Sequence, residues 1–391
     1  MARISEIAAD TLVKECLQSF KSGVAETLQL AVQIQQIPAP TFDEGARADF
    51  VQELFKGIPL INIQRDSLHN VFGCLRGSGS STPVVVTSHL DTVFPAETDL
   101  SIRIENGQGN LYQRIYGPGI ADNAVGVAGL ITLARAMQYF DLKTAADIWF
   151  VANVGEEGLG DLNGMRRVVD RFGEIGVYLV VEGGSYGNIF NRAIGVRRYK
   201  IEVATPGGHS WGDFGVASAI HVLSRIIADI DKIPLPAEPK SSYNIGVIEG
   251  GTSVNTIAAS ASCLLDLRSH DKDSLESLTA LIWQVVGQHE ADPAVKIEVT
   301  KIGDRPSGYI SRDAIPVSWA ADALKYVGCE EISFLGGSTD ANIPLSREYP
   351  AVCIGLANAG NTHRKDEYLE PKNLPMGLSQ LLLLTLAAAN N

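Results

Sequence analysis

The residues best suited to chemistry begin with a histidine and an aspartate that follow a run of valines. In VVVTSHLDTVFP, His89 and Asp91 stand two positions apart at the carboxyl end of an expected strand, so their side chains point to the same side. One of them can bind a metal ion while the other accepts the second imidazole N–H and fixes the tautomer. A purely structural hydrogen bond between histidine and carboxylate gives the same pattern, so the pair alone favours neither interpretation.

A third residue of this kind, Asp122, lies in GPGIADNAVGVAGLI, immediately before a segment rich in glycine and alanine that is expected to be a helix. Aspartate is common at a helix N-cap, and that structural role is the simpler interpretation if the motif stands alone. A carboxylate in this position can also bridge two cations with its two oxygens.

Two adjacent carboxylates, Glu156 and Glu157, follow the apolar run DIWFVANV and stand between glycines. Like charges at a buried strand end destabilise each other unless a cation or a shared proton compensates them. A surface turn would tolerate the pair, but a buried strand end would not. The pair therefore favours a functional site.

Two further residues complete the set. Glu182 ends the apolar run of GVYLVVEGG, and His363 lies in the polar segment NTHRKDEYLEP, where a lone histidine is usually only exposed. Together, two histidines and several carboxylates, nearly all at strand ends, suit two cations with mixed nitrogen and oxygen ligands, and one glutamate is left over as a base. None of these positions is a cysteine, which excludes a structural thiolate zinc site.

These residues need a scaffold that brings several strand ends together. Residues 1–35 have the apolar spacing of a helix, Thr41 and Glu44 are expected to form a capping box for a second helix, and residues 123–139 are expected to be helical. Valine- and isoleucine-rich runs alternate with these helices. The alternation indicates an α/β domain with a mixed, largely parallel sheet, which would place its site at the strand ends.

The pattern changes near residue 195, where strand, helix, strand, strand, helix and strand follow one another in the ferredoxin-like order. We therefore expect an inserted α+β domain over residues 195–304. It would separate the two parts of a catalytic domain, residues 1–194 and 305–391.

Composition narrows the range of partners. The chain has 391 residues, enough for two domains, and its formal net charge of −13 argues against binding to nucleic acid or to an anionic membrane. Its five cysteines are scattered, its N-terminus has no apolar signal-peptide core, and its longest apolar run, LLLLTLAAA, is too short to span a bilayer. These features predict a soluble, cytoplasmic protein that binds small molecules, metal cations or copies of itself.

The sequence resembles the di-zinc exopeptidase and aminoacylase family, which includes peptidase T, glutamate carboxypeptidase, aminoacylase, and the acetylornithine and succinyl-diaminopimelate deacylases. The resemblance covers essentially the whole chain and rests on motifs that follow the family's order: SHLDTVFP, GIADN, GEEG, VVEGG, GGHS, GGTSVN, DLRS, GGSTDAN and NTHRKDEYL. Three of its segments, SHLDTVFP, VGEEGLGD and GGSTDAN, resemble the peptidase T-like branch most. The resemblance implies a di-zinc catalytic domain and an inserted domain that serves as a lid and mediates dimerisation.

The family pattern also implies a role for each residue of the set. It assigns one zinc ion to His89, Asp122 and Glu182, and a second zinc ion to Asp122, Glu157 and His363. Co²⁺ or Mn²⁺ would be substitutes. A metal-bound water would be the nucleophile, Glu156 the general base, and Asp91 the carboxylate behind His89.

Three residues of the insert match lid positions of the family. His209, in TPGGHSWG, would polarise the scissile carbonyl, often across a dimer, while Asn255 and Arg268 would hold the substrate. An ordinary salt bridge on a strand is an equally good interpretation of Arg268. The segment GGSTDAN, residues 336–342, resembles a glycine-rich loop that lines the substrate pocket.

The resemblance implies hydrolysis of an amide bond in small peptides, of the aminopeptidase, tripeptidase or carboxypeptidase kind, and leaves a deacylase of N-acyl amino acids as the alternative. Glu182 favours the deacylase, because the peptidase members commonly carry aspartate there. A catalytically inactive binding relative is a weaker alternative, since the five ligands and Glu156 are all present. A cofactor-dependent α/β enzyme is disfavoured because no G-x-G-x-x-G turn follows the first strand.

Overall fold

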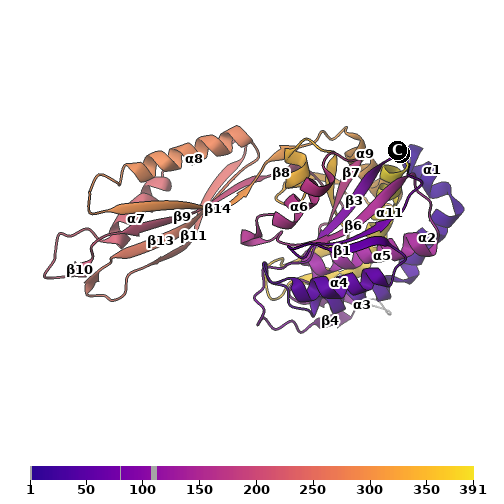
Figure 1. Ribbon diagram of the computed structural model, residues 1–391, viewed down its shortest axis with the longest axis horizontal. Helices are drawn as coiled ribbons and strands as arrows, with labels where there is room; N and C mark the ends of the chain where they lie inside the picture. Colours follow the sequence, from indigo (N-terminus) through magenta and orange to yellow (C-terminus); the bar gives the residue numbers. More distant parts are fainter. Residues whose placement is uncertain (1, 80, 107–111) are drawn as a thin grey trace. The chain divides into compact units, whose positions relative to one another are not determined.

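The computed structural model describes residues 2–79, 81–106 and 112–391 (Figure 1). The chain divides into two compact units, one formed by Met1–Ala193 and Tyr309–Asn391, and the other by Ile194–Gly308. Each unit has an apolar core of its own, because the buried side chains of the second unit form a separate cluster.

A mixed sheet lies at the centre of the first unit. Over the described residues its order is β1-β2-β6-β3-β7-β17-β8-β15, and β16 pairs with β8. The strands are Ile61–Arg65 (β1), Val71–Leu75 (β2), Ser81–His89 (β3), Ala146–Asn153 (β6), Val177–Glu182 (β7), Asn188–Ala193 (β8), Gly308–Tyr309 (β15), Ser333–Gly337 (β16) and Ala351–Gly355 (β17). Because β6, β3, β7 and β17 are parallel neighbours, their carboxyl ends lie along one edge. The predicted α/β class with a mixed sheet is confirmed. The sheet was expected to be largely parallel and is partly parallel, because β1–β2, β2–β6 and β17–β8 are antiparallel pairs.

Helices pack on both faces of this sheet. The side chains of β3 alternate, so that Val84 and Val86 join the core with α5 and α11, whereas Val85 joins the smaller core with α6. The helices of this unit are Ala2–Ala9 (α1), Thr11–Ser22 (α2), Val24–Gln35 (α3), Gly45–Lys56 (α4), Val125–Tyr139 (α5), Asn163–Phe172 (α6), Ile315–Tyr326 (α9), Asn342–Ser346 (α10) and Leu374–Ala389 (α11).

The helix expected over residues 123–139 begins later, because a π-helical turn, Ile120–Ala124 (η1), precedes α5. The stretch Ile120–Tyr139 is long and apolar enough to cross a membrane by length and composition, but 78% of its apolar window is buried inside the unit. It is a core helix of this unit.

The predicted capping box of Thr41 and Glu44 is wrong. Helix α4 starts at Gly45, and Glu44 makes no side-chain hydrogen bond to the first turn. The Thr41 hydroxyl instead donates to Asp91 Oδ2 at 2.9 Å, and Glu44 Oε1 accepts from the Gly155 N–H at 3.2 Å. The Asp91 carboxylate and the Gly155 N–H are buried at neighbouring strand ends and must be hydrogen-bonded. Thr41 and Glu44 supply these hydrogen bonds instead of capping the helix.

A small sheet of the same unit, β18-β19-β5-β4, links the chain before Asp122 to the chain around His363. Its strands are Arg103–Asn106 (β4), Tyr112–Tyr116 (β5), Asn358–Gly360 (β18) and Tyr368–Glu370 (β19). Tyr368 lies opposite Tyr116 in the ladder between β19 and β5. Two segments far apart in sequence are thereby fixed side by side.

The second unit has the predicted ferredoxin-like order of elements, which is confirmed. Its elements are Gly195–Ala204 (β9), Ala219–Ile230 (α7), Ser241–Gly250 (β11), Ser260–Ser269 (β13), Lys272–Gly287 (α8) and Lys296–Arg305 (β14). The strands form an antiparallel sheet in the order β11-β13-β9-β14. A separate short pair, Gly208–His209 (β10) and Thr256–Ile257 (β12), projects from one end of this sheet.

Candidate metal centre

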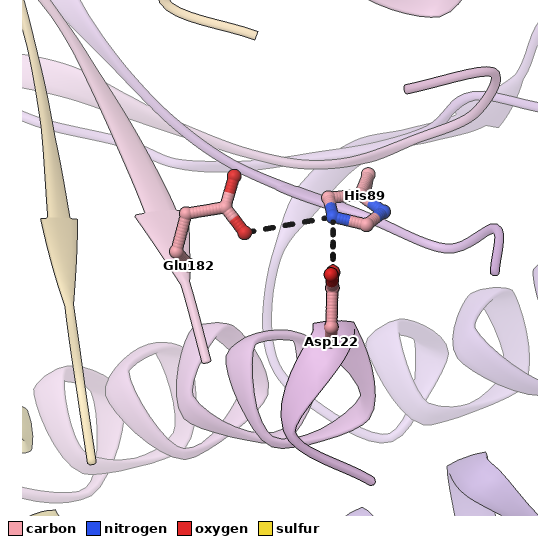
Figure 2. A group of neighbouring side chains, drawn as sticks. All are labelled: His89, Asp122 and Glu182. Carbon is pink, nitrogen blue, oxygen red and sulfur yellow. Dashed lines mark ion pairs between the residues drawn. The ribbon is translucent and has the colours of Figure 1, made fainter. Parts of the chain in front are cut away.

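One histidine and two carboxylates meet at the carboxyl edge of the large sheet. His89 is the last residue of β3, Glu182 is the last residue of the parallel neighbour β7, and Asp122 belongs to η1. Figure 2 shows the three side chains pointing toward one another from these elements. The His89 Nε2 atom lies 3.2 Å from Asp122 Oδ1 and 3.6 Å from Glu182 Oε2.

A second group shares Asp122 with the first. The His363 Nε2 atom lies 3.0 Å from Asp122 Oδ2 and 3.0 Å from Glu157 Oε1. Asp122 therefore directs one oxygen at each histidine. The five residues proposed from the sequence as metal ligands thus fall into two groups of three that have one carboxylate in common.

The donor atoms suit two metal ions. In each group of three, the candidate ligand atoms lie within 4.8 Å of one another. A tetrahedral zinc ion with ligand distances of about 2.0–2.2 Å separates neighbouring ligand atoms by about 3.4 Å, and the contacts of 3.0–3.6 Å in the two groups bracket that value. Imidazole and carboxylate donors are also the types that zinc and similar divalent ions bind.

Protons take the place of the metal charges when no metal is bound. Burial alone would lower the pKa of His89, but hydrogen bonds to Asp122 and other carboxylates raise it well above its ordinary value. Hydrogen bonds to Asp122 and Glu157 raise the pKa of His363 to about 10. Burial raises the pKa of Glu182 and of Glu157. A pair of cations would relieve this crowding of carboxylates and would displace the histidine protons.

Glu156 stands beside the metal groups and is 6% exposed. It forms a further group of candidate ligand atoms with His89 and Glu157, so its carboxylate reaches the same edge of the sheet. It follows β6, the strand next to β3, by a short turn. A carboxylate in this position can move a proton at the centre or bind one of the ions.

Asp91 holds the turn that carries the two glutamates. Its Oδ1 accepts from the Glu156 N–H at 3.0 Å, and its Oδ2 accepts from the Glu157 N–H at 2.9 Å. The His89 Nδ1 atom lies closer to the Asp91 carbonyl oxygen, at 3.1 Å, than to the carboxylate Oδ1, at 3.6 Å. Burial alone would raise the pKa of Asp91, but the His89 ring and these N–H groups outweigh it and lower the pKa.

Three buried carboxylates near the centre were missed by the reasoning from sequence. Burial raises the pKa of Glu44 to about 6, of Asp340 to about 7 and of Glu367 to about 7. Asp340 lies in the GGSTDAN segment and accepts from Asn153 Nδ2 at 2.7 Å. Glu367 follows three charged residues, a pattern typical of an exposed loop, and only its position directly before a strand hinted at burial.

The second unit brings two of its three predicted substrate-binding residues together. His209 and Asn255 lie at the short β10–β12 pair, where the Ser210 N–H donates to the Asn255 carbonyl oxygen at 3.0 Å. The His209 Nδ1 atom accepts from the N–H groups of Trp211 and Gly212, both at 3.2 Å. In the neutral ring the proton is therefore on Nε2, which is left to donate.

Arg268 lies away from these two residues. It is opposite Val196 near one end of β13, whereas the other end of β13 leads back to β12 through Ser260. Arg268 follows Ser260 by eight positions along β13, and eight positions of extended strand span about 26 Å. Its Nε atom donates to Asp266 Oδ1 at 2.7 Å, so the salt bridge considered as the structural interpretation of Arg268 is present.

The model of peptidase family M20/M25/M40 matches residues 85–386. Succinyl-diaminopimelate desuccinylase of Corynebacterium glutamicum is 25% identical over 358 residues, covering 88% of this chain and 92% of the relative. Carboxypeptidase G2 of Pseudomonas sp. is 21% identical over 389 residues, covering 94% of this chain and 90% of the relative. Among solved structures, a tripeptidase of Staphylococcus aureus superposes with a TM-score of 0.78 at 20% identity, covering 93% of this chain and 98% of that chain.

Proposed function

Because the chain belongs to peptidase family M20/M25/M40, we propose that it is a metal-dependent hydrolase that cleaves an amide bond in small peptides. One observation carries the proposal: Asp122 directs its two oxygens at two separate groups of histidine and carboxylate donors. The tripeptidase and the carboxypeptidase among the similar proteins support a peptide as the substrate.

We propose that His89, Asp122 and Glu182 hold one divalent cation and that Asp122, Glu157 and His363 hold the other. Zinc is proposed for both, because the donors are imidazoles and carboxylates at spacings that suit a tetrahedral ion. Bound cations would supply Lewis acidity toward the amide carbonyl and toward water.

The proton transfers are proposed for Glu156. Its carboxylate would accept a proton from the attacking water and return it to the leaving nitrogen, which is general base and then general acid catalysis. The backbone hydrogen bonds from Glu156 and Glu157 to Asp91 hold the turn in place, so that Glu157 can bind a cation while the Glu156 carboxylate carries the proton. Burial of both glutamates keeps bulk water from competing for that proton.

For the second unit we propose the roles of a lid and of a dimerisation surface. His209, with its Nε2 proton, would donate to the carbonyl oxygen of the scissile bond, and Asn255 and Arg268 would bind the substrate. Arg268 lies toward one end of β13, and the β10–β12 pair that carries His209 lies toward the other end. One small substrate would therefore not contact both Arg268 and His209 of the same chain. The separation supports a homodimer in which His209 serves the partner's substrate, and sedimentation of a monomer at assay concentration would contradict it.

A deacylase of N-acyl amino acids is the second candidate. Glu182 favours it, as does the similarity to the desuccinylase. In either case we propose a cytoplasmic protein, supported by the absence of disulfides among the five cysteines, all of which belong to the described residues.

A mass-spectrometric turnover assay tests the function. Zinc-loaded protein is incubated with pooled di- and tripeptides and with pooled N-acetyl and N-succinyl amino acids. The Glu156→Gln variant and a chelator-treated sample serve as controls for contaminating hydrolases. Chelator-sensitive loss of peptides supports the peptidase, and preference for the acylated pool supports the deacylase. Loss of neither pool, or equal loss with the variant, contradicts the proposal.

A further inference from the structure

Glu367 is a buried carboxylate outside the proposed set of metal ligands. Its exposed fraction is 0%, and it immediately precedes β19. Burying a carboxylate is unfavourable unless it is hydrogen-bonded, so the partners of this side chain indicate why the fold keeps it. Those partners are backbone groups of the two loops that carry proposed metal ligands.

The two oxygens of Glu367 bind different loops. Oε1 accepts from the N–H groups of Ala121 and Asp122, at 2.9 and 3.0 Å, and Oε2 accepts from the His363 N–H at 3.3 Å. Asp122 and His363 are the residues whose side chains meet at 3.0 Å in the second metal group. One carboxylate therefore ties together the backbones of two proposed ligands that are 241 residues apart.

Glu367 is itself held by the small sheet. Its carbonyl oxygen accepts from the Gly117 N–H at 2.9 Å, and its N–H donates to the Arg364 carbonyl oxygen at 3.0 Å. The next residue, Tyr368, pairs with Tyr116 in the ladder between β19 and β5. The carboxylate is thus presented from a rigid element rather than from a free loop.

The loop that carries His363 needs such support. His363 has a φ of 66° and Asn361 a φ of 56°, so two non-glycine residues occupy the left-handed region within three positions. That conformation is unfavourable for residues with a side chain and persists where surrounding contacts hold it. The bond from the His363 N–H to Glu367 is one contact that holds it.

We infer that Glu367 is a positioning residue that preorganises the second metal group and thereby sets the affinity of that group for a divalent cation. Residues that orient metal ligands typically change metal affinity by about 10- to 100-fold when they are replaced. The inference rests on the two-metal centre of the proposed function, and it is independent of the substrate.

Substitution of Glu367 with glutamine distinguishes the hydrogen bonds of Oε1, to Ala121 and Asp122, from the hydrogen bond of Oε2, to His363. Glu367→Gln keeps one oxygen, which can continue to accept from Ala121 and Asp122, but turns an NH₂ group toward the His363 N–H. We therefore expect the affinity for one of the two cations to fall by about 10- to 100-fold while the affinity for the other is little changed. Glu370→Gln is the matched control, because Glu370 ends β19, the strand that Glu367 precedes, but accepts from the Arg114 side chain.

The experiment is a Zn²⁺ titration of metal-free protein in competition with a fluorescent zinc chelator. It is performed on the wild type, on both glutamine variants, on His363→Ala and on the double variant Glu367→Gln/His363→Ala. If Glu367 acts through His363, the double variant binds its remaining cation as His363→Ala does, since the contact is already lost. Thermal unfolding of the metal-free proteins reports any general loss of stability separately.

Two results would overturn the inference. One is unchanged binding of both cations by Glu367→Gln. The other is an equal weakening of both cations together with a lower unfolding temperature of the metal-free variant, which would indicate a general structural role. A wild-type protein that binds fewer than two Zn²⁺ ions would instead contradict the proposed two-metal centre, so the two failures are distinguishable.

Discussion

The adjacent residues Glu156 and Glu157 allow a matched test of which carboxylate moves the proton and which binds metal. Both are 6% exposed, and both backbone N–H groups donate to Asp91, at 3.0 and 2.9 Å. Substituting either with glutamine preserves side-chain shape and leaves these backbone bonds in place. A difference between the two variants therefore reports the role of the carboxylate and not the integrity of the turn.

We expect Glu156→Gln to bind two Zn²⁺ ions as the wild type does, because neither proposed group of three ligands includes Glu156. Its turnover should fall by about 10²- to 10⁴-fold, the usual contribution of a general base, which raises the barrier by about 2.7–5.5 kcal/mol. Glu157→Gln removes a charged oxygen that lies 3.0 Å from His363 Nε2. The affinity of its second cation should fall by more than the roughly 10- to 100-fold seen when a residue that merely orients a ligand is lost.

The assays are zinc titration with a competing chelator and single-turnover kinetics at saturating Zn²⁺. Since His89, Glu156 and Glu157 also form a group of atoms close enough to bind an ion, the opposite assignment has a clear signature. Loss of one zinc equivalent in Glu156→Gln, with full stoichiometry in Glu157→Gln, would refute the assignment of Glu156 as the base. Turnover of Glu156→Gln within tenfold of the wild type would refute it as well.

Three further predictions concern charge at and behind the centre. Asp122→Asn keeps a single carbonyl oxygen and should retain about one tightly bound Zn²⁺ per chain, measured by metal analysis after dialysis; full retention of two would contradict the bridging role. The carboxylate partners of His363 raise its pKa to about 10, so the ring is protonated at pH 7 in the metal-free protein. Because zinc must displace that proton, the zinc affinity of the group that contains His363 should rise as pH increases from 7 toward 10. Competition titrations that find the same zinc affinity across this pH range would contradict the prediction. Burial raises the pKa of Asp340 to about 7, so the folded metal-free protein keeps a proton that the unfolded chain releases above about pH 4, and its unfolding free energy should fall between about pH 4 and pH 7. Between pH 5 and pH 8 that fall amounts to about 3 kcal/mol, because the folded-state group stops gaining over the unfolded one near pH 7. Asp340→Asn should remove it in denaturant titrations at these two pH values, and an equal difference from the wild type at both would contradict the assignment.

The sequence alone determined the class of the fold, and it predicted the residues that the fold brings together as the candidate metal centre. Valine-rich runs alternating with helices require a partly parallel sheet, because such strands must be buried on both faces. A histidine or an acid at the end of such a strand, as at His89 and Glu182, must then lie at the edge where parallel strands end. The change near residue 195 predicted the ferredoxin-like unit, because a different order of strands and helices is visible without any contact.

The tertiary structure decided which residues hold the centre in place. Thr41 and Glu44 have the spacing of a capping box, but the Thr41 hydroxyl donates to Asp91, and Glu44 accepts from the Gly155 N–H as well as from the local Phe42 N–H. Glu367 reads as part of a charged loop, yet it is buried, and its carboxylate accepts N–H groups from the distant Ala121–Asp122 segment as well as from the nearby His363. Local spacing reports strand ends and helix faces, whereas the partner of a buried polar group depends on which segments the completed fold brings together.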